Sequence, residues 1–101
     1  MAKFNPPDGT VFDWRDSTTT IETQDCETAF LEVSNLSGGD TLVVKASLGA
    51  TARTLAWVKE DLTTGTTISA DGIYQFPAIG ILSYTRTGSA SNPALNLQLV
   101  K

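Results

Sequence analysis

The chain has 101 residues, the length of one ordinary domain, and a formal charge of −4 at pH 7. Its seven basic residues are scattered from Lys3 to Lys101, whereas phosphate contacts need clustered Lys and Arg, so a nucleic-acid partner is not expected. No stretch approaches the ~18 apolar residues of a membrane span, and residues 1–7 lack the apolar core of a signal peptide. A single cysteine, Cys26, excludes an internal disulfide. We therefore expect no membrane partner and a protein that is made without an export step.

The first segment is proline-rich. Pro6 and Pro7 remove backbone donors and fix φ, so a helix or a central strand is not expected here. We predict an extended N-terminal arm over residues 1–9 and one domain over residues 10–101.

The rest of the chain is predicted to form short strands separated by turn residues. Residues 41–48 alternate most clearly, with Leu42, Val44, Ala46 and Leu48 on one face. Leu97 belongs to a second alternating run, so it should share one core with Leu42 and Val44. The predicted strands are Val11–Trp14, Thr18–Glu22, Ala29–Val33, Thr41–Leu48, Thr66–Ser69, Gly72–Phe76, Ile79–Thr87 and Leu95–Val100.

Residues 52–62 are compatible with either a helix or a strand. Leu55, Val58 and Leu62 have helical spacing, whereas Thr54 and Trp57 favour a strand, and strand is the preferred reading. Threonine is abundant along the chain, and its β-branched side chain suits the solvent face of a sheet. Roughly eight short strands with frequent turns predict an all-β fold, a single-domain β-sandwich of jelly-roll-like type.

The sequence offers few candidate catalytic residues. The chain contains no histidine, which removes the usual general base, and Cys26 lies between two carboxylates that disfavour a thiolate. The spacing of the acidic residues fits no known calcium loop, so neither a metal nor a cofactor is expected. These acidic residues are Asp8, Asp13, Asp16 and Asp25. We predict that the protein is not an enzyme.

The aromatic residues raise the question of ligand binding. They could form a platform for stacking sugars, but a domain this small needs most of them in its core. The set is Trp14, Trp57, Tyr74, Phe76 and Tyr84. Core packing is the preferred reading, and a carbohydrate-binding module is the alternative, which requires exposed, coplanar rings.

The stretch TTISADGIYQFPAIGILSYTRTGSASNPALNLQL, residues 66–99, resembles the closing strands of small accessory structural proteins of tailed bacteriophages. The likeness lies in short threonine-rich strands separated by small-residue turns. From the residues alone, Asp71-Gly72 suits a tight hairpin, Gly80 suits a bend, and Arg86 can reach a carboxylate on a neighbouring strand.

The resemblance implies a virion structural protein that is made in the host cytoplasm, most specifically a capsid decoration (cement) protein on the capsid surface of a phage. It would bind the major capsid protein of the same virion as a homotrimer and stabilise the shell. The alternative within virions is a tail or fibre module. The expected partner-binding residues are Phe4, Asn5, Pro6, Pro7 and Trp14.

Overall fold

The structure, a computed structural model, describes residues 2–101, and this part of the chain contains eleven strands and no helix. The bounds of the strands are β1 (Ala2–Phe4), β2 (Val11–Asp13), β3 (Thr19–Glu22), β4 (Thr28–Ser34), β5 (Thr41–Ser47), β6 (Arg53–Thr54), β7 (Trp57–Lys59), β8 (Thr64–Gly65), β9 (Gly72–Pro77), β10 (Ile81–Thr87) and β11 (Ala94–Val100). Residues 2–101 therefore contain no helix that is long and apolar enough to cross a membrane.

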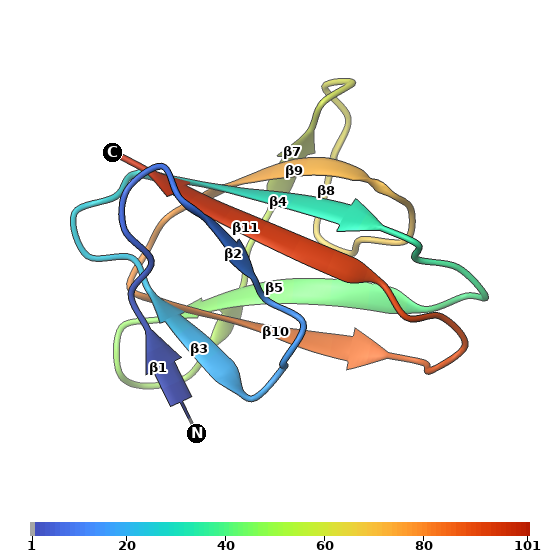
Figure 1. The fold of residues 1–101 in the computed structure, drawn as a ribbon, viewed down its shortest axis with the longest axis horizontal. Helices are drawn as coiled ribbons and strands as arrows, with labels where there is room; N and C mark the ends of the chain where they lie inside the picture. The colour runs from blue at the N-terminus through green and yellow to red at the C-terminus, as the bar shows by residue number, and fades with distance from the viewer. Residues whose placement is uncertain (1) are drawn as a thin grey trace.

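The strands form two facing sheets, with the chain crossing repeatedly from one to the other (Figure 1). One sheet has the order β1-β3-β10-β5-β6, and the other has the order β2-β11-β4-β9-β7-β8. All strand pairs are antiparallel except β1 with β3, which is parallel. The prediction of an all-β, single-domain sandwich is confirmed.

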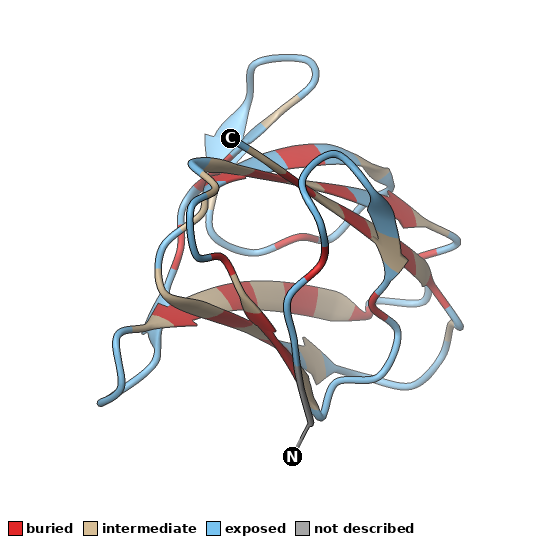
Figure 2. Ribbon diagram, turned by 60° about the vertical axis from the view of Figure 1, so that its left-hand side comes forward, coloured by how far each residue is buried: buried red, intermediate tan, exposed pale blue. Residues whose placement is uncertain are grey.

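The core lies between the sheets, and the alternation of the sequence places the side chains there. Figure 2 shows the buried residues recurring along the strands while the connecting loops are mostly exposed. Leu42, Val44 and Leu97 are each 1% exposed and belong to one apolar cluster, as predicted. Leu48 was expected on the same buried face, but β5 ends at Ser47 and Leu48 is 85% exposed.

Residues 52–62 form two short strands, β6 and β7, which belong to different sheets. The chain changes sheet at Leu55, whose N–H donates to the carbonyl of Val44. The preference for strand over helix is thus confirmed, although the segment is not one continuous element.

The strand predicted at Thr66–Ser69 is wrong in its position, because β8 lies earlier, at Thr64–Gly65. Within the predicted range only Ile68 pairs with another strand, through a bridge to Leu42. The shift has a packing reason, since a Cβ on Gly65 would lie 2.8 Å from the ring of Trp57. Only a glycine allows the backbone to pass so close to that ring.

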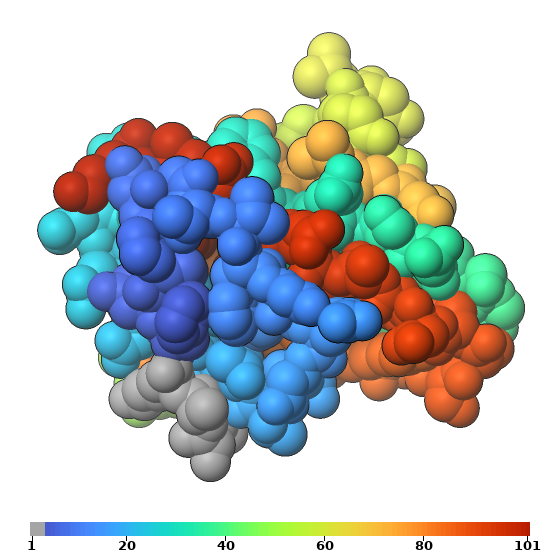
Figure 3. Space-filling view, in the orientation of Figure 1, coloured from blue at the N-terminus to red at the C-terminus, as the bar shows by residue number. Residues whose placement is uncertain are grey.

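Residues 4–9 lie against the body of the sandwich (Figure 3). Residues 2–4 form β1 at the edge of one sheet, and the ring of Phe4 stacks on Phe12 with centroids 4.4 Å apart. Further along, the N–H of Gly9 donates to the carbonyl of Leu99 at 2.8 Å. The segment is extended, but it is fixed to the body at both ends.

Candidate interaction surfaces

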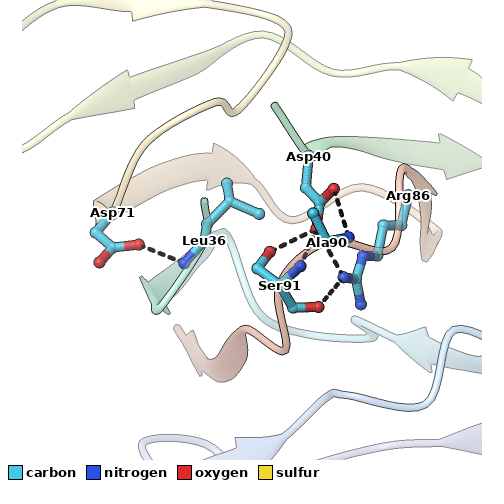
Figure 4. A network of polar contacts seen from close by, with 6 residues as sticks. All are labelled: Leu36, Asp40, Asp71, Arg86, Ala90 and Ser91. Atoms are coloured by element: carbon cyan, nitrogen blue, oxygen red, sulfur yellow. Dashed lines mark hydrogen bonds and ion pairs between the residues drawn. The ribbon is translucent and has the colours of Figure 1, made fainter. Parts of the chain in front are cut away.

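A buried carboxylate closes one end of the β5–β10 pair (Figure 4). Asp40, directly before β5, accepts hydrogen bonds from the N–H of Ala90 at 3.1 Å, from the N–H and hydroxyl of Ser91 at 2.7 and 2.5 Å, and from Arg86 at 2.9 Å. Arg86 also donates to the carbonyl of Ser91. The hydrogen bonds from Ser91 in particular hold the pKa of Asp40 well below its ordinary value of 3.8. As predicted, Arg86 reaches a carboxylate, although Asp40 lies directly before the neighbouring strand β5 and not within it. The network fixes the loop before β11.

A second carboxylate fixes a loop on the other sheet. Asp71 accepts from the N–H groups of Asn35 and Leu36 at 3.1 and 2.9 Å. The expected tight hairpin at Asp71-Gly72 is absent, because β9 pairs with β4 and β7 and not with the strand directly before it. The role of Asp71 is therefore to tie the loop after β4 to the start of β9.

The remaining acidic residues do not converge on one point. Asp13 pairs with Arg15 at 2.8 Å, and Asp8 accepts from the N–H of Lys101 at 3.0 Å. Asp16 accepts from the hydroxyl and N–H of Thr18, which lower its pKa. Within residues 2–101 no three His, Cys, Asp or Glu side chains gather as metal ligands would. Asp25 lies with Cys26 and Asp8 along a hollow of about 180 Å³ beside the N-terminal segment.

The aromatic residues considered as a sugar platform are in the core. Each is at most 9% exposed, namely Trp14, Trp57, Tyr74, Phe76 and Tyr84. Two pairs meet edge to face, Trp14 with Tyr84 and Trp57 with Tyr74. These rings cannot stack on an external ligand, so the preference for core packing is confirmed.

The expected partner-binding residues are only partly at the surface. Phe4 is 39% exposed, and Asn5 and Pro7 are also exposed, so these three form one surface, the N-terminal surface. Pro6 is buried, and Trp14 is only 1% exposed, with its indole N–H bonded to the carbonyl of Thr19. The expectation that Trp14 contacts a partner is therefore wrong, because its ring is part of the core.

A second surface, missed in the sequence, lies at the other end of β5. Ser47 and Leu48 border two hollows, and we call these two residues the Leu48 ridge. The first hollow, of about 350 Å³, is largely apolar and includes Ile79 and Arg53, so we call it the Arg53 hollow. The second is a shallow, open depression that includes Glu22, and we call it the Glu22 hollow. The signal in the sequence is a leucine directly before Gly49, where the alternation of β5 ends.

The ridge is held in a defined shape by its own turns. The hydroxyl of Ser47 accepts from the N–H of Gly49 at 3.0 Å and donates to the carbonyl of Ala50. The neighbouring turn is fixed by Thr23, whose hydroxyl donates to the carbonyl of Gly80 at 2.8 Å. The exposed leucine therefore stands on an ordered support and would lose little freedom on contact with a partner.

The fold defines the class to which this protein belongs, a small two-sheet β-sandwich with all of its core between the sheets. No family model matches the chain, and no curated protein matches it. Among solved structures, the crystal structure of the SPBc2 prophage-derived protein YomS is similar, with a TM-score of 0.79 and 14% sequence identity. The alignment covers 97% of each chain, so the two proteins share the fold from end to end.

Proposed function

We propose that this protein is a non-enzymatic structural protein of a tailed-phage particle, specifically a capsid decoration protein. It binds the major capsid protein on the assembled shell as a homotrimer and stabilises the shell. The observation that carries the proposal is the likeness, over almost the whole of both chains, to a prophage-derived protein. The resemblance of residues 66–99 to accessory phage proteins points in the same direction.

The N-terminal surface supplies the contact with the shell. Its three residues are Phe4, Asn5 and Pro7, and the segment that carries them is already paired with β3 and bonded to β11. A segment that is ordered before binding loses less conformational entropy on docking than a free coil does. Deleting the segment would remove β1 and expose Phe12, so substitutions of exposed side chains give the cleaner test.

The test uses empty shells assembled from the major capsid protein of the same genome, with binding followed by co-sedimentation. We expect the wild-type protein to saturate the shells and the double variant N5K/P7K to lose most of its binding. The matched control is Leu62→Lys, an exposed change on the β7–β8 hairpin that projects elsewhere on the molecule (Figure 1).

Two results would count against the proposal in different ways. Failure of the wild-type protein to bind any shell, together with its location on the tail in images of particles, would show a tail or fibre module. Unchanged binding of N5K/P7K would leave decoration in place but remove the N-terminal surface from the contact.

A further inference from the structure

We propose that the Arg53 hollow binds a small aliphatic carboxylate, with the alkyl chain in the hollow and the carboxylate against the guanidinium of Arg53. The inference concerns a ligand of the free protein, so it goes beyond the proposed binding to a shell and does not depend on it. The hollow has a volume of about 350 Å³. This volume lies within the range of roughly 300–1,000 Å³ that is usual for small-molecule sites.

The hollow exists because the core is not filled at the end of β5. Ala46 is the last buried residue of this strand, and its side chain is a single methyl group. Alternation would place Leu48 next on the same face, but the strand ends at Ser47 and Leu48 is exposed. The other apolar walls come from Leu55 and Ile79, which lie in two connections between the sheets. The hollow therefore lies at an end of the space between the sheets.

The charge at this hollow comes from an arginine that has no partner in the chain. Arg53 lies opposite Ala46 in the β5–β6 pair, and directly opposite residues share a face of the sheet, so its side chain is on the core side. Its guanidinium forms no hydrogen bond or ion pair with residues 2–101, whereas Arg15 and Arg86 are each paired with an aspartate. Among the described residues that line the hollow there is no Asp or Glu. The positive charge of Arg53 is therefore available to a ligand.

An apolar hollow beside an unpaired guanidinium favours a ligand that has both an alkyl chain and an anionic group. The chain would cover apolar surface that is now in water, including that of Ile79, which is 43% exposed. The planar guanidinium presents parallel N–H donors that match the two oxygens of a carboxylate. A neutral alkyl compound would lack the ion pair, an alkylammonium ion would be repelled by Arg53, and acetate would leave the hollow unfilled.

The test is a titration of isotope-labelled full-length protein with octanoate, below the concentration at which octanoate forms micelles, followed by NMR spectra of the backbone amides. We expect saturable shifts in the signals of Ala46, Leu55 and Ile79. Octanol should bind roughly tenfold more weakly, because it lacks the charge-assisted hydrogen bonds to Arg53. Octylammonium and acetate should give no saturable shifts over the same range. Octanoate shifts that do not saturate, or that are as large on other surfaces, overturn the inference.

A first pair of variants tests the role of the charge. Arg53→Gln should weaken octanoate binding roughly tenfold and leave octanol binding unchanged, because only the carboxylate uses the guanidinium. The matched control is Lys45→Gln, which removes a cation from the opposite face of the same strand and should bind octanoate like wild type. Equal octanoate affinity in Arg53→Gln and wild type overturns the inference, and so does an equal loss in both variants.

A second pair of variants tests the location of the alkyl chain. Ile79→Asn replaces an apolar wall of the hollow and should weaken the binding of octanoate and of octanol alike. The matched control is Ile73→Asn, since Ile73 is 44% exposed and borders a different hollow, and this variant should bind both compounds like wild type. Thermal melting establishes that the variants are folded. Unchanged binding in Ile79→Asn, or an equal loss in Ile73→Asn, overturns the placement of the ligand in the Arg53 hollow.

Discussion

The two ends of β5 differ in how far their side chains are covered by the rest of the chain. At its start, Asp40 is 2% exposed and accepts hydrogen bonds from three residues of other segments. At its end, Leu48 is 85% exposed beside two hollows. The polar end is satisfied within the chain, whereas the apolar end leaves a leucine side chain open to solvent.

The neighbouring strand β10 repeats the contrast through two glycines with positive φ. Gly88, beyond its end, lies where a Cβ would be 2.2 Å from the carboxylate of Asp40. Gly80, before its start, lies where a Cβ would be 2.2 Å from the carbonyl oxygen of Ser47. Both glycines allow close approach, but one supports a closed network and the other supports the exposed ridge. Close approach of the backbone at a strand end therefore does not by itself indicate that the side chains at that end are covered.

The largest expected effect compares the same substitution inside the core and on the ridge. Leu97→Ala should lower the free energy of unfolding by roughly 2–5 kcal/mol, because it leaves a cavity in the core. Leu48→Ala should have almost no effect on single chains, since its side chain is already in water. Urea unfolding at protein concentrations low enough to prevent association measures both. Equal losses would show that Leu48 is buried in the single chain.

The next prediction concerns the hydrogen-bond network of Asp40 at the start of β5. Asp40→Asn removes the charge facing Arg86 and places amide hydrogens against donors, so we expect a fall in Tm on the order of 10 °C. Asp71→Asn, at an exposed carboxylate with a similar capping role, is the matched control and should cost much less. A comparable loss in both variants would show that burial of Asp40 adds nothing.

Asp40 also predicts how stability depends on acid. Its folded pKa is below the ordinary 3.8, so its contribution is fully present above that value. The contribution is lost as the pH falls through and below this value, toward the folded pKa. Melting curves between pH 7 and pH 2 should therefore show a steeper decline for wild type than for Asp40→Asn. Parallel declines would contradict the assignment.

A smaller effect is expected for Tyr84, which lies in the middle of β10. Burial raises the pKa of Tyr84 to about 12, and its hydroxyl donates to the carbonyl of Arg15 at 2.7 Å. The resulting stabilisation is complete below pH 10 and is lost as the pH rises through 10 toward and beyond 12. Tyr84→Phe should lose this alkaline sensitivity at a cost of about 1 kcal/mol at neutral pH. An unchanged alkaline decline in the variant would assign the sensitivity to another group.

The smallest effect separates the two exposed leucines. Leu62 has a φ of +70°, a region that asparagine tolerates better, so Leu62→Asn should raise the free energy of unfolding by roughly 0.5–1 kcal/mol. Its self-association should remain as in wild type. Thermal melting and light scattering on the same sample measure both quantities, and a loss of association would mean that the β7–β8 hairpin takes part in the contact.

The alternation of apolar and polar residues was sufficient to predict the long strands. Alternation identified β5 and β11 and placed Leu42 and Leu97 in one core, because successive side chains of a strand point to opposite faces. It also supported the assignment of most aromatic rings to the interior. It favoured strand at residues 52–62 but did not show the division there, where the chain leaves one sheet and enters the other within two residues. No local sequence pattern specifies which sheet each half of this segment joins.

The candidate surfaces depended on the fold in the same way. The sequence by itself determined the all-β class, the buried faces of the long strands and the reach of Arg86 toward a carboxylate. Only the tertiary structure decided that Trp14 is buried, that the N-terminal segment joins a sheet, and that Leu48 remains uncovered. The physical reason is that alternation is set by the local geometry of a strand. Whether a side chain at the end of a strand is covered depends instead on loops that are distant in sequence and brought there by the crossings between sheets.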